Sequence, residues 1–112
     1  GVVRWAHADH IASTCGWIFP PEEVFVAEIL KSVLGILALP GPLIRHGALR
    51  IKGILRVQEG SMSLHADADG VRLEPLRRSS DSRLEIIVPP DQSPPWGAIE
   101  AAIVSASMPR ER

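Results

Sequence analysis

The fold is decided by the stretch LRIKGILRVQEGSMSLHADADGVRLEP, which covers residues 49–75. Over residues 49–57, apolar side chains alternate with a mostly basic set, and a period of two is typical of a half-buried β-strand. Gly60 and Gly70 follow at the positions where tight turns need a residue without a side chain. The stretch therefore predicts three consecutive antiparallel strands.

Further strands and two helices are expected on either side of this stretch. Residues 10–19 and 84–88 alternate in the same way and are rich in β-branched or aromatic types, which favour strands. Apolar residues three and four apart predict one helix that begins after Pro21 and ends near Gly35, and a second from Trp96 to Ala106. No particular structure is predicted for the two proline-containing connectors, residues 36–48 and 89–95.

These elements predict an α+β fold, a two-layer sandwich in the order β-α-β-β-β(-β)-α. A mostly antiparallel sheet of four or five strands would have both helices on one face, because each amphipathic helix must bury its apolar stripe. The 112 residues suffice for one domain, expected over residues 10–108, with an N-terminal arm at 1–9 and a frayed tail at 109–112. The expected core consists of Trp17, Leu30, Val33, Leu49, Ile51, Leu55, Leu64, Leu73, Leu84, Ile86, Ile99 and Ile103.

Composition excludes several classes of partner. The 12 basic and 13 acidic side chains give a net charge of -1, which favours neither nucleic acid nor an anionic membrane. The longest apolar run, residues 29–44, is interrupted by Lys31 and Pro40 and is too short to span a bilayer. Cys15 is the only cysteine, so no intrachain disulfide can form, and a cytoplasmic setting is expected.

A metal site can be imagined near the N-terminus. His7 and His10 are three residues apart, and Cys15 follows five residues later, so zinc or cobalt has possible ligands. Neither a strand nor an irregular segment places residues three apart on one side, so we favour a solvated arm and expect no tight metal site. Asp67 and Asp69 resemble a D-x-D metal motif, but they flank a turn glycine, where aspartate serves the backbone.

The basic residues of the central strand are the candidate partner surface. Arg50, Lys52 and Arg56 share one face of that strand and could contact an acidic partner. The alternative is a solvated face on which they pair with acidic residues of neighbouring strands, such as Glu74 and Glu85. Tyrosine is absent and phenylalanine is scarce, which argues against binding of single-stranded nucleic acid.

Three short motifs occur in an order that indicates a family. They are GWIFP at residues 16–20, RIKGILR at residues 50–56 and DSRLEII at residues 81–87. In this order the chain resembles the C-terminal domain of CobW-family GTPases and metallochaperones, from about His10 to Ala106. The resemblance implies a parent protein whose N-terminal GTPase domain binds GTP and Mg²⁺ and handles zinc or cobalt. It also suggests a link to cobalamin biosynthesis.

The resemblance assigns this chain an accessory role and no enzymatic activity of its own. The phosphate-binding motif G-x-x-x-x-G-K-S/T and a cysteine-rich metal motif are both absent from these 112 residues, so no cofactor site is expected here. The domain would regulate the GTPase domain or dock a client protein that receives the metal. The chain begins at Gly1 without a methionine, and we interpret it as a piece of a longer protein.

Two alternatives to the accessory role are open. The first is a free-standing module that binds a small ligand or dimerises through its sheet. The second is an enzyme acting through Cys15 and a histidine, which would need a nearby base and a positive pocket to lower the pKa of the thiol.

Overall fold

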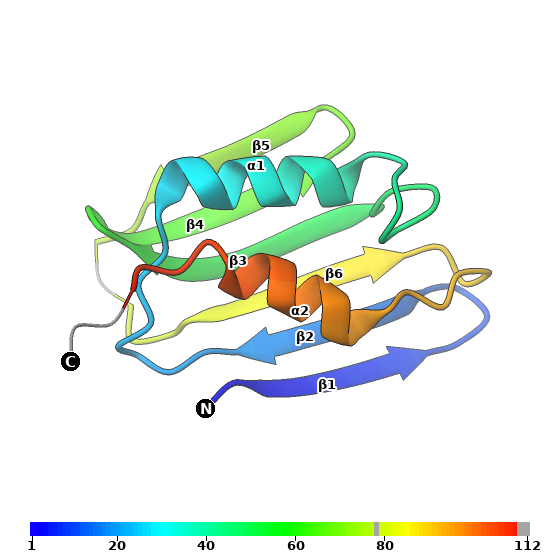
Figure 1. Cartoon of the computed structure of the whole chain (residues 1–112), viewed down its shortest axis with the longest axis horizontal. Coiled ribbons are helices and arrows are strands. Elements are labelled where there is room, and N and C mark those ends of the chain that lie inside the picture. The colour runs from blue at the N-terminus through cyan, green and yellow to red at the C-terminus, as the bar shows by residue number, and fades with distance from the viewer. Residues whose placement is uncertain (78, 110–112) are drawn as a thin grey trace.

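A computed structural model describes residues 1–77 and 79–109 and shows one sheet covered by two helices (Figure 1). In chain order the elements are β1 (Val3–Ala8), β2 (Ser13–Ile18), α1 (Ala27–Ala38), β3 (Arg50–Val57), β4 (Gly60–Asp67), β5 (Gly70–Pro75), β6 (Arg83–Val88) and α2 (Trp96–Val104). Among these residues no helix is long and apolar enough to cross a membrane.

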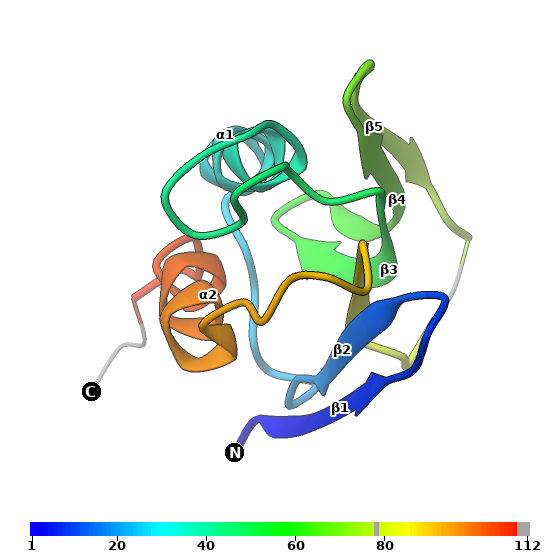
Figure 2. The same ribbon diagram turned by 90° about the vertical axis from the view of Figure 1, so that its right-hand side faces the viewer.

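The six strands form a single antiparallel sheet in the order β1-β2-β6-β3-β4-β5. Strands β3, β4 and β5 follow one another directly, and β6 then returns to fill the place between β2 and β3. Both helices lie on the same face of the sheet (Figure 2). The predicted two-layer α+β fold is therefore confirmed.

The turns of the predicted three-strand stretch form for the expected reasons. Gly60 and Gly70 adopt positive φ angles of 131° and 136°, which residues with a side chain rarely adopt. The backbone N–H of Asp69 donates a hydrogen bond of 2.8 Å to the Oδ1 atom of Asp67. The aspartates thus shape the turn, as their position beside the glycine predicts.

Most of the expected core is buried between the sheet and the helices. The fully buried predicted residues are Trp17, Leu30, Ile51, Leu55, Leu64, Leu84, Ile86, Ile99 and Ile103. Val33 and Leu73 are partly buried against this core. Leu49 is 56% exposed, and its prediction as a core residue is wrong. It precedes the first residue of β3, so the alternation of the strand does not fix its side.

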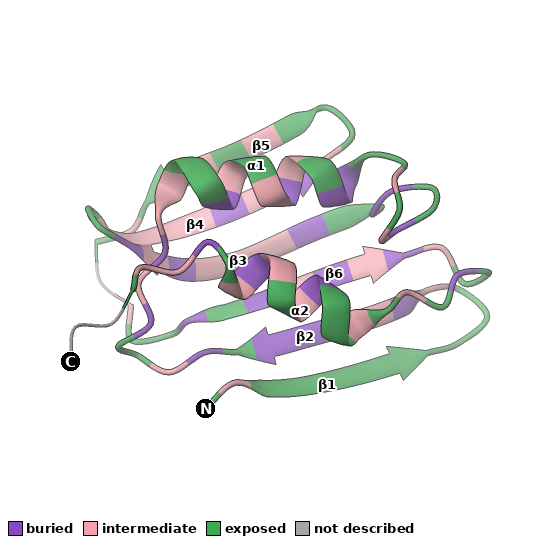
Figure 3. Cartoon of the chain, in the orientation of Figure 1, coloured by how far each residue is buried: buried purple, intermediate pink, exposed green. Residues whose placement is uncertain are grey.

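The N-terminal segment differs from the expected solvated arm. Residues 3–8 form β1, which pairs along its length with β2. Every residue of β1 is exposed, whereas β2 is mostly buried (Figure 3). An edge strand with little buried surface needs no clear alternation, so its sequence gives a weak signal. This strand makes the sheet larger than the four or five strands predicted.

Helix α1 is longer than the sequence suggests. It continues through Gly35 to Ala38 and buries Leu30, Leu34 and Leu37. Burial of these leucines outweighs the cost of about 1 kcal/mol for a glycine inside a helix. At the other end of the chain, residues 110–112 of the expected frayed tail lie outside the described residues.

Candidate partner-binding face

The sheet face opposite the helices, here called the open face, carries the candidate site. In β3, Ile51 and Leu55 are buried toward the helices, so alternation directs Lys52 and Ile54 to the open face. Cross-strand pairing extends this face across the sheet in two rows. One row contains Ile18, Arg83, Ile54 and Ser63, and the other contains Trp5, Gly16, Glu85, Lys52 and His65.

Trp5 of β1 lies against Gly16 of β2, its partner in the sheet. A Cβ atom at Gly16 would overlap the indole ring of Trp5, so glycine is what allows the ring to lie on the backbone of β2. The Trp5 residue is still 44% exposed. It therefore presents a large aromatic surface at the edge of the open face.

A hollow of about 520 Å³ lies between the two rows. Its apolar lining includes Trp5, Ile18 and Ile54, and its polar lining includes Lys52 and Arg83. Apolar walls with a few polar groups are typical of a binding site. The sequence did not predict this hollow, because its lining comes from strands that are distant along the chain.

The predicted partner surface belongs to this same open face. Lys52 pairs with Glu85, with 3.5 Å between its Nζ atom and the Oε1 atom of the carboxylate, as the alternative of cross-strand pairing predicts. Arg50 lies opposite Ile87, and Arg56 lies opposite Ser61. Over residues 1–77 and 79–109, the ion pairs include neither of these two arginines. Two of the three predicted side chains thus carry a positive charge that forms no ion pair with any described residue.

The structure does not bring the three candidate metal ligands together. His7 pairs with Thr14 in the sheet, and Cys15 pairs with Ala6, so alternation places the His7 and Cys15 side chains on opposite faces. His10 lies in the exposed turn between β1 and β2. Within the described part of the chain, no group of three histidine, cysteine or carboxylate side chains could hold a metal ion.

Burial raises the pKa of the Cys15 thiol to about 11, with a smaller opposing effect from the positive charge of Arg4. The thiolate is the reactive form, so native Cys15 is expected to resist alkylation at about pH 8 and to react once the chain is unfolded. Because this pKa lies above its ordinary value of 9.0, the buried thiol stabilises the fold below pH 9. That stabilisation is lost as the pH rises from 9 toward 11.

Iodoacetamide labelling in buffer and in urea measures the reactivity of Cys15, and urea unfolding across this pH range measures the stability. A Cys15→Ala variant should lose the Cys15-linked part of the pH dependence. Stoichiometric labelling of the native protein at about pH 8 would contradict the burial of this thiol and revive a nucleophilic role.

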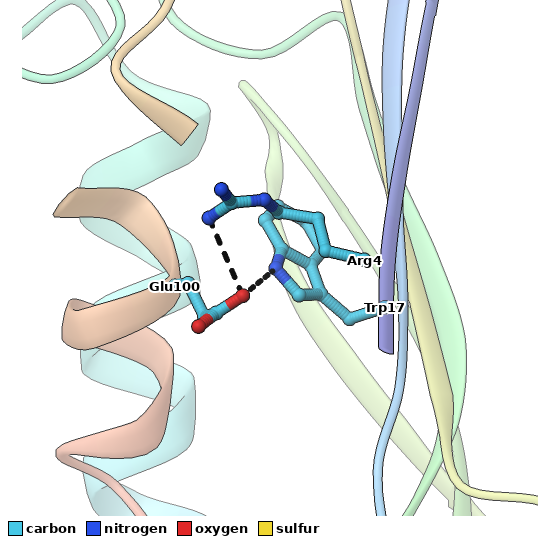
Figure 4. Close-up of polar contacts among 3 residues, drawn as sticks. All are labelled: Arg4, Trp17 and Glu100. Atoms are coloured by element: carbon cyan, nitrogen blue, oxygen red, sulfur yellow. Dashed lines mark hydrogen bonds and ion pairs between the residues drawn. The ribbon is translucent and has the colours of Figure 1, made fainter. Parts of the chain in front are cut away.

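A polar contact that the sequence did not reveal joins the sheet to α2 (Figure 4). The buried indole of Trp17 donates a hydrogen bond of 3.0 Å from its Nε1 atom to the Oε1 atom of Glu100. Arg4 of β1 pairs with the same oxygen at 3.4 Å. The ring of Trp17 also meets Trp96 edge-on, with centroids 6.1 Å apart. Glu100 is the one charged residue of α2, and this isolated charge is the feature of the sequence that could have indicated a polar contact.

Replacing Glu100 with alanine is expected to lower the free energy of unfolding by about 1–3 kcal/mol, because the buried indole N–H of Trp17 loses its acceptor. Glu100→Gln keeps an oxygen acceptor and loses only the exposed ion pair with Arg4, which is worth about 0–1 kcal/mol. Urea unfolding of both variants measures the difference. Equal costs for the two substitutions would show that the hydrogen bond to Trp17 contributes nothing.

The fold and the open face define a small α+β domain with one helix-covered sheet face and one face available for binding. Comparison with curated proteins finds similarity to the zinc chaperone YeiR of Escherichia coli, 31% identical over 93 residues. The match covers 80% of this chain and 24% of the length of that protein, and it supports a CobW-like relationship. No family model matches the chain. No solved structure matches it either.

Proposed function

We propose that this chain is an accessory domain of a CobW-type, GTP-dependent metal chaperone in the cytoplasm. In this role it regulates the GTPase domain or docks the client that receives the metal. The observation that carries the proposal is the similarity to a zinc chaperone over 80% of the chain. Because that relative is a zinc chaperone, zinc is favoured as the metal, and the similarity gives no support to a link with cobalamin biosynthesis.

The nucleotide and the metal are assigned to another part of the parent protein, because the residues of this chain do not fit them. GTP binding of this kind needs a glycine-rich loop whose backbone N–H groups surround the phosphates, followed by a lysine. The two lysines of the chain lie elsewhere: Lys31 in α1 and Lys52 in β3. Neither follows such a loop.

A free-standing module that binds a small ligand or dimerises is the second candidate. The hollow beside Trp5 favours it, because a hollow of about 520 Å³ could also accept a small molecule. The accessory domain and the free-standing module differ in what the gene is expected to encode upstream of this chain.

The sequence of the gene upstream of the codon for Gly1 tests the choice. Under the accessory role, the same reading frame encodes a G-x-x-x-x-G-K-S/T loop and a cysteine-rich metal motif. A frame that starts close to Gly1, or that encodes an unrelated domain, would contradict the accessory role. It would leave the free-standing module as the better account.

A further inference from the structure

We propose that the open face docks an acidic protein segment that inserts one large apolar side chain into the hollow beside Trp5. This inference deepens the proposed function by naming the chemistry of the partner. It rests on that function only for the statement that the partner is a protein.

A contiguous apolar patch lies at the β1–β2 end of the open face. Val3, Trp5 and Ile18 are 57%, 44% and 52% exposed, and Val3 lies directly opposite Ile18 in the sheet. Single exposed apolar residues are common, but adjacent ones beside a hollow indicate an interaction site. Ile54 continues the apolar lining on the far side of Arg83. An inserted apolar side chain would therefore contact apolar groups from three strands.

Basic side chains outnumber acidic ones on the open face. Alternation and pairing place five basic and three acidic side chains on the open face, namely Arg50, Lys52, Arg56, Arg72 and Arg83 against Asp67, Glu74 and Glu85. The whole chain has a net charge of -1, so this face opposes the overall sign.

Three of these basic groups form no ion pair within the part of the chain that the structure describes. Among the described residues, Lys52 pairs with Glu85 and Arg83 pairs with Asp81, while the ion pairs do not include the other three arginines of the face. Both basic residues that line the hollow are thus paired, but Arg50 and Arg56 lie two residues from Lys52 and Ile54 on the same face of β3. Positive charge without an ion pair therefore lies beside the hollow, where it is complementary to carboxylates that flank an apolar side chain. Interfaces of this type keep the apolar anchor central and the charges at the rim.

The composition of the face favours protein over nucleic acid or membrane. Glu85 lies in the middle of the row that runs from Trp5 to His65. A nucleic acid carries a phosphate at every nucleotide and would meet this carboxylate, whereas a peptide can place its few carboxylates beside Arg50 and Arg56 instead. Of the two tryptophans that line the hollow, Trp17 is completely buried and Trp5 alone offers an exposed ring, whereas single-stranded nucleic acid favours several stacking rings. Asp67 and Glu74 on the same face would also oppose an anionic lipid surface.

A random peptide library displayed on phage and selected against the purified chain tests the inference. The enriched peptides should contain one large apolar residue flanked by aspartates and glutamates. Their affinity should fall about tenfold with Trp5→Ala at every salt concentration, since the aromatic wall of the hollow is lost. The double variant Lys52→Gln, Arg83→Gln should weaken binding mainly at low salt, because its effect is electrostatic.

Lys31→Gln is the control for the loss of positive charge away from the open face, because it removes one positive charge from α1 on the helix-covered side of the sheet. Each variant should unfold at a temperature close to that of the unaltered chain. Failure to enrich acidic peptides, or binding that Trp5→Ala leaves unchanged, would overturn the inference. Tighter binding of single-stranded RNA or phosphatidylserine vesicles than of the selected peptides would do the same. The gene-sequence test of the proposed function is independent of all these outcomes.

Discussion

Ile51→Ala is expected to lower the free energy of unfolding by about 2–5 kcal/mol. Ile51 is completely buried in β3, and it lies opposite Ala66 in β4 and Ile86 in β6. Truncation removes three carbon atoms from the centre of the sheet, where the backbones of both neighbouring strands prevent the cavity from closing. Equilibrium unfolding in urea measures this loss.

Leu49→Ala is the matched control for this experiment. Leu49 is two residues earlier in the chain and 56% exposed, so its truncation should change the stability by less than about 0.5 kcal/mol. An equally small loss of stability for Ile51→Ala would show that Ile51 does not belong to the core. A large cost for Leu49→Ala would instead support its original prediction as a core residue.

Gly53→Ala is expected to cost about 1–3 kcal/mol, although it adds only one methyl group. A Cβ atom at Gly53 would overlap the backbone oxygen of Arg83 and would lie 3.0 Å from the Cα atom of Leu84. Both atoms belong to the backbone of β6, the strand next to β3, so no side-chain rotation can relieve the overlap. The two central strands would have to separate locally.

Gly35→Ala in α1 makes the same chemical change with the opposite expected sign. A Cβ atom there meets only the Cγ2 atom of Val71, at an ordinary contact distance of 3.8 Å. Alanine is favoured over glycine inside a helix by about 0.5–1 kcal/mol, so this variant should be more stable. Thermal and urea unfolding of both variants test the pair. Stabilisation by Gly53→Ala would contradict the close approach of β3 and β6.

Much of the fold could be predicted because its central strands carry strong local signals. The alternation of residues 49–57 and the glycine turns at Gly60 and Gly70 fixed β3, β4 and β5. The helical spacing of apolar residues located α1 and α2, although the prediction that α1 ends near Gly35 was wrong. These features act over a few residues, so they can be recognised without knowing the tertiary structure.

The remainder depends on contacts between distant residues. β1 is an exposed edge strand, so neither burial nor alternation marks its residues. The hydrogen bond from Trp17 to Glu100 joins residues 83 positions apart. Arg50, Lys52 and Arg56 share one face of β3, as their alternation predicts, but the hollow beside them also needs Trp5 of β1 and Arg83 of β6. Those neighbours follow from the strand order, which the local pattern does not determine.

Isothermal titration calorimetry of this chain with GTP and Mg²⁺ is the most direct test of the accessory role. The chain has no glycine-rich loop followed by a lysine, so no binding heat is expected. A longer protein from the same gene, extended upstream of Gly1, should bind GTP under the same conditions and serves as the positive control. Micromolar or tighter binding of GTP by the 112-residue chain itself would contradict the account.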